Sequence, residues 1–95
     1  MRKAYIVTGH TGSYSDYTEW VVKAYFNHLK AELLLQACKD TLAVYAKWCD
    51  EDTDGGWDFD KFAQTHVIPD PQYTGSSYDP GYFIVPIEIE EDDNA

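Results

Sequence analysis

The segment Asn27–Cys49, NHLKAELLLQACKDTLAVYAKWC, decides the fold because its apolar residues recur at three- and four-residue steps. That spacing gathers them on one side of an α-helix and leaves the polar residues on the other. Asn27 is a favoured N-cap residue, so we expect the helix to begin there and to end near Trp48 or Cys49. The expected buried side consists of Ala31, Leu34, Leu35, Cys38, Leu42, Tyr45, Ala46 and Cys49.

Three segments with alternating apolar residues surround this helix: KAYIVTG (3–9), WVVKAYFN (20–27) and YFIVPIEIE (82–90). Alternation at every second residue is typical of β-strands. Pro86 cannot donate to a strand ladder, so the last strand should lie at an edge or carry a bulge. The order β-β-α-β predicts an α+β fold with a three-stranded, mainly antiparallel sheet and one long helix packed on one face. In the second strand, alternation predicts a shared face for Trp20, Val22, Ala24 and Phe26.

The 95 residues fit a single domain, residues 1–95, because this length lies close to the usual domain size. Residues 50–81 are rich in acids, proline and glycine, and we expect an acidic loop with one or two helical turns around DFDKFAQTH. Residues 90–95 should form a frayed acidic tail.

The charge is unevenly distributed along the chain. Residues 1–48 hold six basic and four acidic residues, whereas residues 49–95 hold one basic and thirteen acidic residues, giving the net charge of −10. An acidic surface repels phosphates, so direct nucleic-acid binding is not expected. No apolar run suits a secretory leader or a membrane span, and Cys38 and Cys49 fit a reducing compartment as small apolar fillers. These features predict a cytoplasmic protein that does not bind a membrane.

The acidic loop contains part of a calcium-binding pattern. Counted from Asp50, an EF-hand loop has acids at positions 1, 3, 5 and 9, which are Asp50, Asp52, Asp54 and Asp58. Position 12, where a bidentate Glu is required, is Lys61. The segment is therefore interpreted either as a solvent-exposed acidic loop or as a weak calcium site, with no other cofactor indicated.

No segment predicts an enzyme, because the polar residues of the first loop match no nucleophile motif. Aromatic residues are more informative. If the last strand pairs antiparallel with the first, the first loop and the residues before the last strand lie at one end of the sheet. That arrangement would gather tyrosines into a partner-binding surface, or would pack them onto the core. The tyrosines concerned are Tyr14, Tyr17, Tyr73, Tyr78 and Tyr82, of which the first four are predicted to bind the partner.

Two segments resemble a group of small tailed-phage and prophage proteins. They are YIVTGHTGSYSDYTEWVVKAY (5–25), with its TG-x-YSD-x-x-EW core, and IPDPQYTGSSYDPGYFIVPIEI (68–89), with its DP…YTG…Y pattern. The resemblance covers the two ends of the chain and implies a shared fold without an established reaction. It also implies that the protein acts in the host cytoplasm, where small phage proteins commonly bind host machinery.

The sequence thus predicts an acidic phage accessory protein that binds a host protein with a basic nucleic-acid-binding surface, in the manner of nucleic-acid-mimicking anti-CRISPR proteins. Alternatives are a calcium-binding module and a virion-associated structural domain. We expect a monomer or a weak homodimer. The acids predicted to bind the partner are Asp50, Glu51, Asp52, Asp54, Asp58 and Asp60, with Glu88, Glu90 and Glu91 as a second group.

Overall fold

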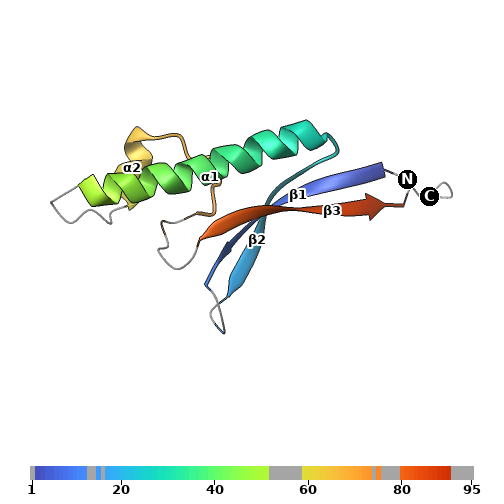
Figure 1. Cartoon of the computed structure of the whole chain (residues 1–95), viewed down its shortest axis with the longest axis horizontal. Helices are drawn as coiled ribbons and strands as arrows, with labels where there is room; N and C mark the ends of the chain where they lie inside the picture. Colours follow the sequence, from blue (N-terminus) through green and yellow to red (C-terminus); the bar gives the residue numbers. More distant parts are fainter. Residues whose placement is uncertain are drawn as a thin grey trace.

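The computed structural model describes most of the chain, namely residues 2–12, 15, 17–51, 59–73, 75 and 80–90. Its elements in sequence order are β1 (Arg2–Thr11), β2 (Thr18–Tyr25), α1 (His28–Glu51), α2 (Phe59–Thr65) and β3 (Gly81–Ile89). Figure 1 shows both helices on the same side of a three-stranded sheet. The α+β class, the antiparallel sheet and the long helix that the sequence predicts are confirmed.

The sheet has the order β2-β1-β3, so β1 is the central strand and β3 lies at an edge, as Pro86 predicts. Both pairings of β1 are antiparallel. At one end of the sheet His10 is paired with Gly81, and at the other end Arg2 is paired with Ile89. The first loop and the start of β3 therefore lie at the same end of the sheet.

A bulge in β2 changes which side chains share a face. The register with β1 shifts between Val7 and Thr8, so that Lys23 is opposite Val7 whereas Val21 is opposite Thr8. Because a bulge inserts one residue into the alternation, the side chains beyond it move to the other face. The prediction that Trp20 and Ala24 share a face is therefore wrong: Trp20 lies opposite Gly9, on the helix side.

Helix α1 begins as the sequence predicts, because Asn27 Oδ1 accepts a hydrogen bond of 3.1 Å from the backbone N–H of Lys30. It continues to Glu51, two residues beyond the expected end. Ala31, Cys38, Tyr45 and Cys49 are buried as expected. Ala46 is exposed, contrary to expectation, since it lies about 100° around the helix axis from Tyr45 and at the border of the buried side.

An apolar core cluster joins the second half of α1, α2 and the segment that follows α2. It contains Tyr45, Cys49, Phe62 and Tyr73, with Leu42, Trp48, Phe59 and Ile68 packed around them. Phe62 of α2 is fully buried, and its ring centroid lies 4.9 Å from that of Tyr45. The segment 59–73, which the sequence assigns mainly to an acidic loop, therefore supplies an essential part of the core.

Candidate protein-binding site

The C-terminal end of α1 and the start of α2 form an acidic end of the molecule. Asp50 and Glu51 occupy the last turn of α1, Asp60 occupies the first turn of α2, and all three side chains are exposed. The last turn of α1 contains no basic residue. Lys47 Nζ lies 3.9 Å from Glu51 Oε1, but both side chains are mostly exposed and such a pair contributes little.

The carboxylates of α1 stand where a helix is least able to accommodate them. Unsatisfied carbonyl groups give the C-terminal end of a helix a partial negative charge, which favours cations and disfavours anions. Asp60 has the opposite relationship, since the first turn of α2 favours a carboxylate. Asp50 and Glu51 therefore add to a negative potential that the backbone already creates.

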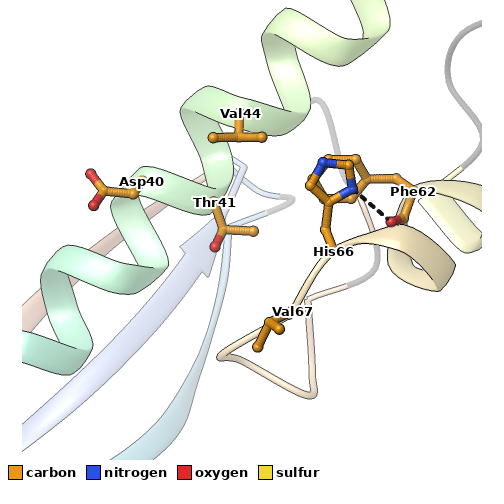
Figure 2. Close-up of a pocket in the computed structure, with 6 residues that line it drawn as sticks. All are labelled: Asp40, Thr41, Val44, Phe62, His66 and Val67. Atoms are coloured by element: carbon orange, nitrogen blue, oxygen red, sulfur yellow. Dashed lines mark hydrogen bonds between the residues drawn. The ribbon is translucent and has the colours of Figure 1, made fainter.

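A shallow hollow of about 140 Å³ lies beside this acidic end, between α1 and the chain that follows α2. Figure 2 shows Thr41 and Val44 on α1 across from His66 and Phe62, with Val67 below them and the Asp40 carboxylate directed away. The His66 ring stacks on Phe62 with centroids 4.0 Å apart, and His66 Nδ1 lies 3.1 Å from the Phe62 carbonyl oxygen. Val67 is 91% exposed and Val44 is 45% exposed, so the hollow presents apolar surface to solvent.

The hollow is not predicted by the sequence, although the sequence contains one signal of it. Val44 follows Asp40 by four residues, which places an apolar side chain on the polar side of α1. Val67 gives no comparable signal, because its exposure depends on where the chain leaves α2.

Asp70 fixes the segment that carries Val67. Its carboxylate is 1% exposed, and Oδ2 accepts hydrogen bonds from Trp20 Nε1 at 2.9 Å and Tyr82 Oη at 2.8 Å. Oδ1 accepts a third from the backbone N–H of Gln72 at 3.0 Å. Gln72 Nε2 in turn donates to the Val21 carbonyl at 2.8 Å. These contacts tie the segment after α2 to both β2 and β3.

Burial also suppresses the ionisation of Tyr82 and Cys38, which lie close to Asp70. Desolvation, reinforced by the hydrogen bond to Asp70, raises the pKa of Tyr82. Burial, with the charge of Asp70 as a smaller cause, raises the pKa of Cys38 to about 11. Cys38 and Cys49 are both free thiols in the interior, which agrees with their expected role as small apolar fillers.

The second predicted group of acids lies far from the first. Glu88 and Glu90 are exposed at the end of β3, and Glu88 is paired in register with Lys3. Figure 1 places that end of β3 at the opposite side of the molecule from the C-terminal end of α1. The described acids of the two groups therefore do not form one continuous surface. Glu91 lies outside the described residues.

Of the tyrosines predicted to bind a partner, the two that the structure describes, Tyr17 and Tyr73, do not lie on one surface. Tyr73 belongs to the core cluster, where burial raises the pKa of its hydroxyl to about 12, so its ring packs inward. Tyr17 is 46% exposed and donates a 2.9 Å hydrogen bond to Glu19 Oε2, which raises the pKa of Tyr17. Its ring stacks with His10 at 5.7 Å. Tyr14 and Tyr78 lie outside the described residues.

Of the four acids of the possible calcium loop, the structure places Asp50. Asp52, Asp54 and Asp58 lie outside the described residues. Among the placed residues, no group of three His, Cys, Asp or Glu side chains could hold a metal ion. No helix in the described parts combines the length and the apolar character that a membrane span requires.

Comparisons with protein-family models, curated proteins and solved structures give no match to this chain. The acidic end, the adjoining hollow and the contacts that hold them in place are the features of the molecule that bear on its function.

Proposed function

We propose that this chain is a non-enzymatic binding protein whose acidic end occupies a basic, nucleic-acid-binding surface of a partner protein. The observation that carries the proposal is the placement of Asp50 and Glu51 in the last turn of α1. Carboxylates there oppose the helix dipole and cost helix stability. Functional sites are where sequences keep such locally unfavourable choices, so this arrangement favours a role in binding.

The adjoining hollow supports a macromolecular partner. Val44 and Glu51 are seven residues apart on the same side of α1, which separates them by about 10 Å along the helix. An apolar centre with a charged rim is the usual anatomy of a protein–protein interface. The hollow, at about 140 Å³, is smaller than the roughly 300 Å³ at which small-molecule sites begin. A protein surface suits its size and shape better than a small ligand does.

The resemblance to tailed-phage and prophage proteins supports a host protein as the partner. A phage protein meets host proteins in the host cytoplasm, and the most useful target for an acidic one is a basic groove that normally holds DNA or RNA. Inhibition of an antiviral complex, as anti-CRISPR proteins do, is the most concrete form of the proposal. The calcium-binding and virion-associated alternatives gain no support from any described residue.

The test compares two variants with the same change in net charge. The first reverses the acidic end (Asp50→Lys, Glu51→Lys, Asp60→Lys), and the second reverses three exposed acids elsewhere (Glu32→Lys, Glu88→Lys, Glu90→Lys). Each immobilised protein is incubated with bacterial lysate at about 0.1 M salt, where the Debye length is ~10 Å. Bound proteins are then released with short double-stranded DNA and identified by mass spectrometry.

The proposal expects the wild-type chain and the second variant to retain a nucleic-acid-binding protein that DNA releases. The first variant should not retain it, and about 1 M salt should release it, because charges are then screened within ~3 Å. Equal loss of partner binding with both variants would show that binding depends on net charge alone and would contradict the proposal. Retention by the acidic-end variant, or release by salt but not by DNA, would contradict the proposal.

A further inference from the structure

The side of the sheet that faces away from the helices carries an apolar surface. Because side chains alternate along a strand, β1 directs Ala4, Ile6, Thr8 and His10 to this side. Register places Val85 and Ile87 of β3 and Val21 of β2 beside them. Val21 is 56% exposed, Val85 37% and Ile87 39%. Figure 1 shows α1 and α2 on the other side, so no described element covers this surface, which we name the open face.

Among the residues that the structure places, the open face carries few acids, although the chain has a net charge of −10. Alternation along β3 directs Glu88 and Glu90 to the helix side, together with Tyr82. The acidic end of the molecule belongs to the helices. Among the described residues, Glu19 is the acid that borders the open face. A second copy, repelled elsewhere by like charge, can therefore approach here.

The open face has a hollow at one end and a projecting side chain at the other. The hollow, of about 310 Å³, is lined by Thr8, Glu19 and Val21, with Ile6, Trp20 and Val85. At the opposite end Phe26 is 51% exposed, and the Arg2 guanidinium lies over its ring at 3.8 Å. Ile6 lies midway between the two ends of β1 and is paired with Ala24 on one side and with Val85 on the other.

We propose that a second copy of this chain packs on the open face, related by a two-fold axis that lies between the two faces and crosses the strands over Ala24, Ile6 and Val85. Such an axis reverses the strand direction, so residues equally distant from Ile6 meet. It sets Arg2 of one copy against His10 and Glu19 of the other, and Phe26 against the hollow beside Val21. The Arg2 guanidinium of each copy therefore meets the Glu19 carboxylate of the other, and the Phe26 side chain of each copy meets the hollow of the other.

The size of the open face sets the strength of this dimer. Three strands about 4.8 Å apart and roughly nine residues long present a face of about 400 Å². Two such faces bury ~800 Å², below the ~1,200 Å² at which stable, specific interfaces begin. We therefore expect a weak, reversible dimer. The proposal is independent of the proposed function, because the acidic end lies on the helical side.

Sedimentation velocity between about 1 µM and about 1 mM protein tests the dimer. The chain should be monomeric at the lower limit and mainly dimeric at the upper one. Raising salt should strengthen the dimer, since it screens the repulsion between two acidic chains. Salt has the opposite effect on the proposed partner complex. A chain that stays monomeric at about 1 mM in high salt overturns the proposal.

Two matched variants locate the interface. Val85→Lys places two lysines against each other at the two-fold axis and should abolish association. Leu33→Lys makes the same change of charge at a side chain of α1 that is 63% exposed and away from the sheet, and should leave association intact. Loss of the dimer with Leu33→Lys, or its survival with Val85→Lys, would overturn the proposal.

A charge exchange tests the axis itself. Arg2→Glu and Glu19→Lys should each weaken the dimer by about tenfold or less, the range expected for exposed charge pairs. The double variant, which restores opposite charges across the axis, should recover most of the lost affinity. Additive losses in the double variant would rule out this two-fold axis.

Discussion

Trp20 and Asp70 are fifty residues apart in the sequence and are joined by a 2.9 Å hydrogen bond from the indole N–H to the carboxylate. Tyr82 donates to the same oxygen, so a residue from a loop holds side chains of two different strands. Trp20 lies on β2 and Tyr82 on β3, on either side of β1. This cluster links the helix side of the sheet to the segment that carries the candidate site.

Replacement of Asp70 should be the most destabilising single change in this region. Asp70→Ala leaves the Trp20 and Tyr82 donors buried without their acceptor, at a cost of about 1–3 kcal/mol for each group. Asp70→Asn should cost less, because the amide oxygen can take the Oδ2 position and still accept from Trp20 and Tyr82, so that only the bond from the Gln72 N–H is lost. Urea unfolding at neutral pH measures both. Glu90→Ala, at an exposed acid outside the helices, is the control and should change stability by less than about 0.5 kcal/mol.

Gly9 should be necessary for stability, because the Trp20 ring occupies the space that a side chain at this position would fill. A Cβ atom at this position would lie 2.6 Å from the Trp20 ring, which crosses the strand there. Gly9→Ala should displace the indole and lower stability by about 1–3 kcal/mol. The same change in a Trp20→Ala background should cost much less. Equal losses in both backgrounds, measured by thermal unfolding, would show that Trp20 is not the obstacle.

Stability should fall at alkaline pH. Cys38 has its pKa raised from 9.0 to about 11 and Tyr73 from 10.0 to about 12, both chiefly by burial. The unfolded chain therefore loses these protons first, and the stability they confer is complete below pH 9 and lost progressively between pH 9 and 12. Urea midpoints measured across that range test this expectation. Tyr73→Phe should make the decline shallower, whereas an unchanged slope would contradict the assignment.

Reversal of the charge at the end of α1 should increase stability. Asp50→Lys places a cation in the last turn, where the helix dipole favours it by about 0.3–1 kcal/mol. The gain should disappear at high salt. Lys39→Glu, at an exposed position in the middle of α1, is the comparison and should show no such gain. A loss of stability with Asp50→Lys would remove the argument that this end of the helix is unfavourable for folding.

Calcium should give no specific stabilisation, because Lys61 stands where an EF-hand loop requires a bidentate glutamate. Thermal unfolding in EDTA, in calcium and in magnesium distinguishes the cases. A ligand at about 100 times its dissociation constant adds ~2.7 kcal/mol, which is several degrees for a domain of this size. A rise of that size with calcium alone would make the loop from Asp50 to Asp58 a metal site.

Local signals in the sequence predict much of the fold. Asn27 at the helix start, Pro86 at the sheet edge and Cys38 on the buried side of α1 each follow from chemistry within a few residues. The bulge near Val21 does not, because it inserts a residue without a glycine or proline to mark it. The packing of Tyr73 against Tyr45 also escapes prediction, since it depends on where α2 is placed in space.

Part of the candidate site can likewise be predicted from the sequence, and part of it depends on the fold. The excess of acids after Cys49 is visible in the sequence, and the end of a predicted helix places Asp50 and Glu51 near its negative pole. The hollow between Val44 and His66 requires two helices to be positioned relative to each other. In the sequence Asp70 is indistinguishable from the other acids of the predicted loop, and only its long-range contacts identify it as buried.

The central position of β1 has a consequence for synthesis of the chain. Its first partner, β2, follows within seven residues, but its second partner, β3, begins seventy residues after the end of β1. At about 5–20 residues per second, β1 keeps one unpaired edge for several seconds on the ribosome. During that time the emerged half is nearly neutral, because thirteen of the seventeen acids come after residue 48. The nascent protein is therefore most prone to aggregation before its last strand arrives, and most soluble once that strand has closed the sheet.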